Sequence, residues 1–209
     1  MALPPLTFPA LVRKAPSRFR PGRTANAMQY VGSPLTGYAQ SVEIPGGKWK
    51  FAIGYDSLDE ADAAKLYSFL LACSGGRLFT LYMWTRPTPR GAGTGTPTVN
   101  GAGQLGLALN VTGIPLNTQN WLLPGDFIGV NGELHTVLNT VNASGNNATI
   151  TLANPMRYAP PASAVITLVR PLITCRLISR SQEWEPKPGA GGKPRSDFAF
   201  DAIEAWDNL

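Results

Sequence analysis

The amino-acid sequence predicts a mainly β protein with one flanking α-helix. Short stretches of alternating apolar and polar residues recur along the chain, and only residues 57–73 have a convincing helical pattern. The 22 glycines and 19 prolines favour many turns. The composition changes near residues 91 and 171, which indicates a β-domain formed by residues 1–90 and 171–209 and interrupted by a small β-module at 91–170. One continuous β-domain with a long excursion is the alternative.

Residues 44–84 form the unit around which the chain is organised, a strand, a helix and a second strand. Trp49, Phe51, Ile53 and Tyr55 alternate with smaller or polar residues, as on a half-buried strand. Ser57 and Glu60 have capping-box spacing and predict the helix start. Gly75 and Gly76 end the helix, and residues 78–84 form the next strand. The apolar helix face comprises Ala63, Leu66, Phe69, Leu70 and Cys73.

The inserted region predicts short strands and tight turns, as in a small barrel or sandwich. Asn131-Gly132 favours a hairpin because both turn positions must accept a positive φ. A second hairpin is predicted between residues 140–142 and 148–152, and residues 105–111 and 165–169 are further strands. In the returning chain, residues 173–179 and 196–206 are predicted strands, and residues 185–195 a loop.

The net charge of +5 is concentrated at the N-terminus. Removing the five basic residues among residues 1–30 from the total of 18 leaves 13 basic against 13 acidic residues. Residues 1–28 are rich in proline and predict an extended arm with one short strand near residues 6–11. The arm is either solvated, docked on an acidic neighbouring subunit, or near nucleic acid. The candidates for subunit contact are Arg13, Lys14, Arg18, Arg20 and Arg23.

The cysteines and the hydropathy pattern restrict the compartment. Cys73 and Cys175 each lie in an apolar pattern and are interpreted as buried free thiols, although a disulfide is compatible with the sequence. No run of about 18 apolar residues predicts a membrane span. The N-terminal prolines interrupt any signal-peptide core, so we expect assembly in the cytoplasm.

The sequence contains no recognisable catalytic constellation. His135 is the only histidine, so neither a Ser-His-Asp triad nor a zinc site of several histidines and cysteines is indicated. The glycine-rich stretches 91–95 and 101–103 lack the lysine of a phosphate loop. We therefore expect no enzyme activity, no metal and no cofactor. Trp121 follows a polar stretch and is the tryptophan expected at a contact surface.

Four groups of segments occur in an order that resembles the distal tail proteins of long-tailed bacteriophages and prophages. These groups are residues 33–37 with 45–49, then 69–81, then 123–128 with 145–149, 155–157 and 164–168, and finally 198–205. The similarity covers most of the chain from about residue 33 onward. The basic N-terminus and the loop at 187–193 depart from the family pattern.

The resemblance implies a structural protein of the virion tail tip. It implies a hexameric ring that joins the tail tube protein to the baseplate hub protein, while DNA passes through the lumen without specific binding. The ring-forming part is then a β-sandwich related to tail-tube proteins, and the insert an outward-facing module of OB-like or similar type. Assembly in the host cytoplasm and no contact with a membrane are implied as well.

Two other classes of function remain open from the sequence. A carbohydrate-binding module would contact a host-surface glycan through Trp121 or Tyr158. A small hydrolase would need a pair of carboxylates, and no spacing among the 13 acidic residues favours one.

Overall fold

The computed structural model describes residues 4–12, 15–31, 39–43, 46–179, 181, 183–189 and 194–206. The described chain is mainly β with one helix, as predicted, and none of its sheets closes into a barrel. A seven-stranded sheet has the order β1-β6-β13-β15-β5-β2, with β14 paired to β15 alone. Its strands are β1 (Leu6–Thr7), β2 (Arg18–Thr24), β5 (Lys48–Leu58), β6 (Phe79–Tyr82), β13 (Leu172–Leu177), β14 (Trp184–Pro188) and β15 (Pro194–Glu204).

The central pairing joins the two longest strands of this sheet, which lie far apart in the sequence. β5 and β15 pair antiparallel, with Phe200 opposite Ile53. The predicted alternation of β5 is confirmed, because Phe51, Ile53 and Tyr55 are buried while Lys50 is exposed. The side chains of Lys50 and Asp201 therefore leave the opposite face of the sheet charged and exposed.

Helix α1 (Glu60–Ser74) packs against β13 and β15 with the predicted apolar face, including Leu66, Leu70 and Cys73. The predicted capping box is wrong. Asp59 is the N-cap, and its carboxylate accepts the Asp62 N–H at 2.9 Å. Ser57 still belongs to β5, where its φ of 57° turns the chain toward the helix.

The short strand predicted near residues 6–11 is confirmed as β1, which pairs with β6. The extended arm predicted for the rest of residues 1–28 is wrong where β2 forms part of the sheet. β2 pairs with β5 along seven residues, and Phe19 stacks on Phe51 at 5.7 Å between ring centroids. Phe8 contacts the ring of Phe69 at 5.1 Å. The pattern was missed because three arginines, a proline and a glycine rarely form a strand. An edge strand tolerates them, since its outer side needs no partner.

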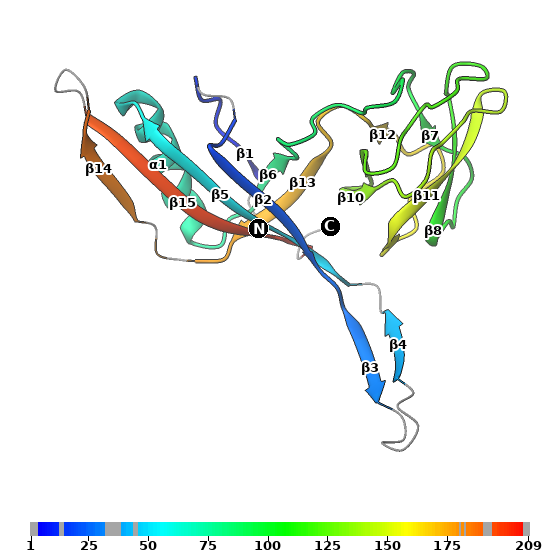
Figure 1. The fold of residues 1–209 in the computed structure, drawn as a ribbon, viewed down its shortest axis with the longest axis horizontal. Helices are drawn as coiled ribbons and strands as arrows, with labels where there is room; N and C mark the ends of the chain where they lie inside the picture. Colours follow the sequence, from blue (N-terminus) through cyan, green and yellow to red (C-terminus); the bar gives the residue numbers. More distant parts are fainter. Residues whose placement is uncertain are drawn as a thin grey trace.

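β3 (Ala27–Val31) and β4 (Ala39–Glu43) form an antiparallel ladder. In Figure 1 these two strands project away from the rest of the molecule. The resembling residues 33–37 between them lie outside the described residues.

The inserted region contains two three-stranded sheets, β10-β9-β12 and β11-β8-β7. Asn131 and Gly132 have φ angles of 49° and 77° between β9 and β10, which confirms the predicted hairpin. The second predicted hairpin is wrong, because β11 pairs with β8, and Val141 only bridges to Leu122. The strands are β7 (Thr98–Val99), β8 (Gly106–Thr112), β9 (Phe127–Val130), β10 (Glu133–Thr136), β11 (Asn147–Met156) and β12 (Ile166–Thr167).

Buried hydrophobic residues gather in two clusters. The body core lies between α1 and the seven-stranded sheet, and the insert core is formed by residues between Val99 and Leu168. Leu134 is the only buried residue of the inserted region that joins the body core. Figure 1 shows the corresponding two parts side by side, joined near β6 and β13. The exact boundaries at residues 90 and 170 stay predictions. The loop predicted over 185–195 is wrong in part, because Trp184–Pro188 form strand β14.

Candidate functional site

The arginines predicted to contact a neighbouring subunit lie on an open sheet edge. Arg18 and Arg20 are exposed on β2, and Arg23 is half-buried. No described strand pairs with the outer side of β2. Arg13 and Lys14 lie outside the described residues. The outer edge of β2, with Arg18, Arg20 and Arg23, therefore remains a candidate for contact with a neighbouring subunit.

The two aromatic candidates for glycan contact differ in their burial. The expectation that Trp121 lies at a surface is wrong, since the side chain is 0% exposed and its Nε1–H donates to the Thr94 carbonyl at 2.8 Å. Tyr158 is 54% exposed. The structure therefore leaves Tyr158 alone available for a stacking contact.

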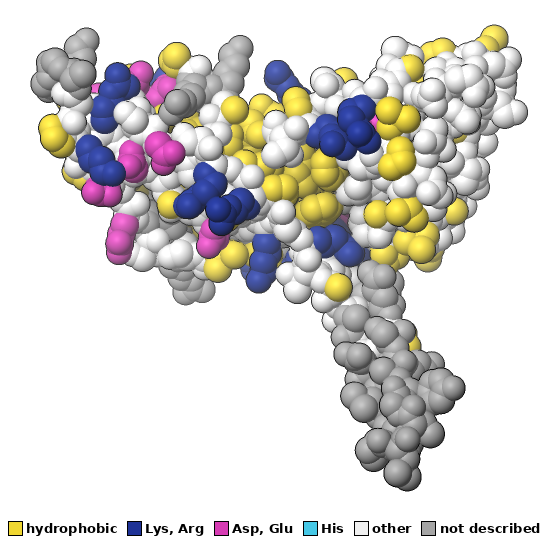
Figure 2. Space-filling model, in the orientation of Figure 1, with side chains coloured by type: hydrophobic (Ala, Val, Ile, Leu, Met, Phe, Trp, Pro, Cys, Tyr) yellow, Lys and Arg dark blue, Asp and Glu magenta, His cyan; other side chains and the backbone are white. Residues whose placement is uncertain are grey.

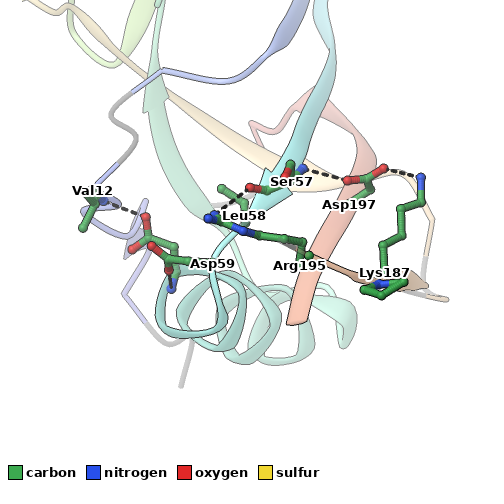
Figure 3. Close-up of a pocket in the computed structure, with 10 residues that line it drawn as sticks. Val12, Ser57, Leu58, Asp59, Lys187, Arg195 and Asp197 are labelled. Carbon is green, nitrogen blue, oxygen red and sulfur yellow. Dashed lines mark hydrogen bonds and ion pairs between the residues drawn. The ribbon is translucent and has the colours of Figure 1, made fainter. Parts of the chain in front are cut away.

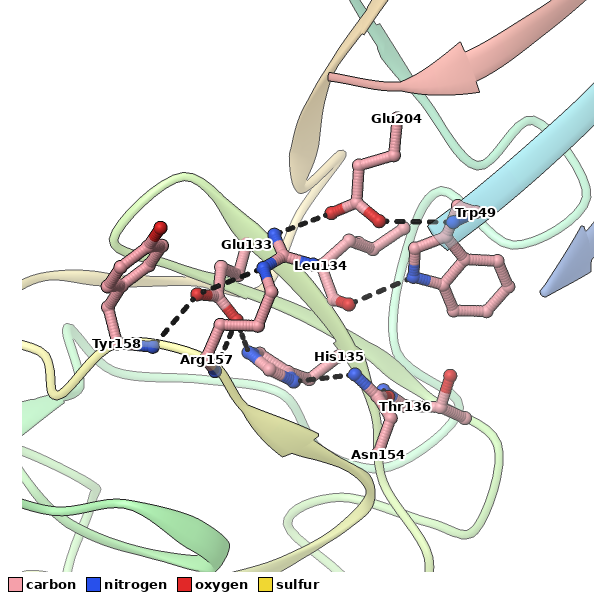
Figure 4. A network of polar contacts seen from close by, with 9 residues as sticks. All are labelled: Trp49, Glu133, Leu134, His135, Thr136, Asn154, Arg157, Tyr158 and Glu204. Carbon is pink, nitrogen blue, oxygen red and sulfur yellow. Dashed lines mark hydrogen bonds and ion pairs between the residues drawn. The ribbon is translucent and has the colours of Figure 1, made fainter. Parts of the chain in front are cut away.

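A buried polar cluster occupies the junction between the two parts, and we call it the ionic junction: Trp49, Glu133, Leu134, His135, Thr136, Asn154, Arg157, Tyr158 and Glu204 (Figure 4). The Arg157 guanidinium bridges two buried carboxylates. Its Nη2 lies 2.9 Å from Glu204 Oε1, and its Nε lies 3.6 Å from Glu133 Oε1. Glu204 also accepts the backbone N–H of Trp49 at 3.0 Å. Residues from β5, β10, β11 and β15, and from the loop after β11, are thus tied together.

His135 belongs to this cluster and is 1% exposed. The Asn154 side-chain nitrogen lies 2.9 Å from His135 Nδ1, which places the imidazole proton on Nε2. That nitrogen faces Glu133 Oε2 at 3.3 Å. Nδ1 thus has a hydrogen-bond partner, whereas Nε2 lies near Glu133 without forming a hydrogen bond of regular geometry. The buried ring has a structural position.

The electrostatics of the ionic junction favour an ionised Glu133. Burial alone would raise the pKa of its carboxyl, but contact with His135 and the positive charge of Arg157 hold the pKa below its usual value of 4.5. The ring of Trp206 lies 3.8 Å from the Arg157 guanidinium carbon and 4.4 Å from Lys48 Nζ. The ionic junction thus holds two carboxylates and one guanidinium, and Lys48 adds a second positive charge on the Trp206 ring.

A further buried carboxylate, that of Asp126, fixes the chain where it enters the insert. Asp126 is 0% exposed, and its oxygens accept the backbone N–H groups of Leu123 at 2.8 Å, Arg90 at 3.0 Å and Gly91 at 3.4 Å. The glycine at 91 has a packing reason, since a Cβ there would lie 2.4 Å from the Trp121 carbonyl oxygen. The glycine-rich stretch that begins at residue 91 is thus packed against the insert.

A polar pocket of about 670 Å³ lies beside the start of α1 (Figure 3). Asp197 accepts the Ser57 N–H at 2.7 Å and pairs with Lys187 Nζ at 2.7 Å. The hydrogen bond to Asp197 raises the pKa of Lys187, so the amine stays protonated and is no base for the Ser57 hydroxyl. Arg195 Nη1 donates to the Ser57 carbonyl at 3.3 Å. The polar groups satisfy one another, and no nucleophile–base pair is formed.

The two thiols are buried and weakly acidic. Cys73 and Cys175 are buried free thiols, as predicted, and burial raises the pKa of Cys73 to about 11 and that of Cys175 well above its usual value. Within the described ranges, no group of three or more His, Cys, Asp or Glu side chains could hold a metal ion. No helix of the described chain is long and apolar enough to cross a membrane.

The chain matches no protein-family model, and no curated protein is significantly similar to it.

Sequence reasoning missed the ionic junction, although one signal was present. Phe198, Phe200 and Ala202 alternate toward the core, and the same period places Glu204 at a buried position. A carboxylate in the core register of a strand requires a buried partner. The identity of that partner, Arg157, follows only from the three-dimensional arrangement.

Proposed function

We propose that this protein is a structural subunit of a long-tailed bacteriophage tail tip, where copies form a ring that joins the tail tube to the baseplate hub. The family resemblance of the sequence supports the class, and the mainly β fold is compatible with it. On the same grounds, we propose a tail-tube-like β-sandwich for the body and an OB-like module for the insert. The number of six subunits follows from the resemblance alone.

The observation that carries the proposal is the ionic junction together with the absence of chemistry elsewhere in the described chain. Arg157 joins Glu133 of the insert to Glu204 of the body inside a largely desolvated cluster. Buried charges cost free energy unless their geometry is fixed, so such a cluster favours one orientation of the two parts. A structural connector requires its two parts to keep a defined orientation relative to each other. Among the described residues, Ser57, Asp197 and Lys187 of the pocket beside α1 are paired with one another and provide no activated nucleophile.

The molecular mass in solution tests this proposal. The chain has a mass of 22.3 kDa, so mass photometry distinguishes a ring from a single copy. We expect closed rings by electron microscopy and the protein at the tail tip of purified virions. A single copy at concentrations of about 100 µM, or absence from virions, would refute the proposal.

The exposed edge strand β2 offers a second test of the ring. Arg20→Glu places a negative charge on the open edge, whereas Arg20→Lys keeps the positive charge. If this edge contacts an acidic neighbour, only the reversal weakens assembly. Equal assembly of both variants would remove β2 from the interface.

The carbohydrate-binding alternative now depends on Tyr158 alone. A Tyr158→Ala variant tested against host cell-wall saccharides would reveal it. Binding by the wild type and loss in the variant would favour an adhesive insert, and no binding by the wild type would leave the insert a spacer.

A further inference from the structure

Two apolar grooves meet at Arg170, where the chain returns from the insert to the body. One has a volume of about 310 Å³ and is lined by Phe8, Tyr82, Trp84 and neighbouring residues. The other has a volume of about 460 Å³ and is lined by Val165, Val169, Leu172 and residues of the β9–β10 hairpin. Figure 2 shows hydrophobic side chains gathered between the body and the insert. We call these two hollows together the Arg170 grooves.

Arg170 is held in position but keeps its charge available. Its φ of 49° lies in the left-handed region, and its N–H donates to the Pro87 carbonyl at 2.6 Å. The guanidinium carbon lies 5.5 Å from the centre of the Tyr82 ring. No carboxylate of the described residues lies within ion-pair distance of it. Val165, Val169 and Leu172 are 69%, 54% and 51% exposed, so a cation is flanked by uncovered apolar surface.

The complementary chemistry lies on another part of the body, on β14 and the residue before it. Trp184 is 43% exposed although its ring lies against that of Tyr67 in a tilted arrangement, with the ring centroids 4.0 Å apart. Glu183 is exposed and forms no ion pair with any described residue, whereas Glu185 pairs with Lys187 at 3.5 Å. β14 pairs with β15 alone, and every residue of the strand is exposed.

We propose that β14 of one copy docks in the Arg170 grooves of the next copy. Glu183 pairs with Arg170, and the free face of Trp184 packs near Tyr82 and Trp84. Charge complementarity selects this occupant, because a free carboxylate beside an exposed indole matches a free guanidinium between apolar walls. The two surfaces differ, so the contact is heterologous and closes into a ring when the rotation permits. This inference rests on the proposed ring.

Charge-reversal variants test the pairing in the full-length protein. We expect Arg170→Glu and Glu183→Lys each to weaken assembly at least about tenfold, because like charges then meet across the contact. Arg170→Lys is the matched control, since it keeps the charge and the backbone position, and should assemble nearly as the wild type does. Thermal unfolding of each variant confirms that the single copy is folded.

Restoration of assembly provides the decisive measurement. The double variant Arg170→Glu with Glu183→Lys again joins opposite charges, so assembly should return. Mixing the two single variants in equal amounts should also restore it, because an alternating ring contains only complementary contacts. A structural effect of either substitution would not be reversed in this way.

The outcomes separate the inference from the ring proposal. If the wild type forms rings and Arg170→Glu forms them equally well, the docking inference is wrong and the ring proposal stands. The inference is also wrong if both single variants lose the ring and neither the double variant nor the mixture restores it. Normal rings that no longer bind another tail protein would assign the grooves to a different acidic partner. A wild type that remains a single copy rejects both proposals.

Discussion

The body core and the insert core are built in opposite ways. The body core is rich in aromatic side chains, and its central strands are distant in sequence, with Phe200 of β15 opposite Ile53 of β5. The insert core is mainly aliphatic with one tryptophan, Trp121, and strands β9 and β10 pair across a two-residue turn. The body therefore requires both ends of the chain, whereas the insert is completed within one continuous segment. This difference makes the connection between them the critical feature.

The ionic junction is where that connection is most vulnerable. Arg157→Ala leaves Glu133 and Glu204 buried without their shared cation, and both carboxylates are at most 3% exposed. We expect a loss of roughly 3–5 kcal/mol in the free energy of unfolding. Urea denaturation followed by tryptophan fluorescence measures it.

An exposed ion pair provides the control for this largest effect. Lys187→Ala removes ion pairs to Glu185 and Asp197, which are at least partly solvated, so we expect a much smaller loss of stability than in Arg157→Ala. If Lys187→Ala and Arg157→Ala lowered the free energy of unfolding equally, burial would not distinguish the two sites. The ionic junction would then have no special role in stability.

The two cores are compared directly by one substitution in each. Leu70→Ala in α1 and Leu109→Ala in β8 delete side chains that are 2% and 0% exposed. Each should cost roughly 2–5 kcal/mol. Because the junction couples the parts, we expect a single unfolding transition in both variants. Two separated transitions in Leu109→Ala would show that the insert unfolds alone. A change below roughly 0.5 kcal/mol in Leu70→Ala would contradict the packing of that helix face.

The pH dependence of stability tests whether Glu133 is ionised in the ionic junction. The pKa of Glu133 is lower in the folded chain than its usual value of 4.5, so protonation favours the unfolded state. Its contribution is therefore complete above about pH 4.5 and decreases as the pH falls through the folded-state pKa. Glu133→Gln should flatten this acid limb in denaturation experiments, whereas Glu185→Gln, at an exposed position, should leave it steep. An unchanged limb in Glu133→Gln would assign acid sensitivity to other groups.

The sequence predicted features that depend on local patterns. The alternation of β5, the apolar face of α1 and the Asn131-Gly132 turn depend on residues within a few positions of one another, and all three are confirmed. β2 and β14 were missed because edge strands tolerate proline and charge, which removes the usual signal. The predicted hairpin partner of β11 is wrong. β11 pairs with β8, which lies earlier in the chain, and not with the adjacent residues 140–142.

The candidate sites depend on burial and on contacts between residues distant in sequence, and a sequence pattern contains neither. Trp121 follows polar residues, yet its indole faces inward because the Thr94 carbonyl accepts its N–H. The Arg157 partnership joins residues 24 and 47 positions apart, so no spacing rule could reveal it. Arg170 and Glu183 differ from the other charged residues in their surroundings and ion pairing, which the sequence alone does not contain.

A small effect on stability is expected at the start of α1, where Asp59 caps the helix. Asp59→Ala removes the carboxylate that accepts the Asp62 N–H, so we expect a loss of about 1 kcal/mol. Ser57→Ala removes a hydroxyl that does not cap the helix and should cost clearly less, since the Ser57 backbone N–H still reaches Asp197. Thermal unfolding of the two variants ranks them. The reverse ranking would restore the capping box expected from Ser57 and Glu60 and would place the helix start two residues earlier.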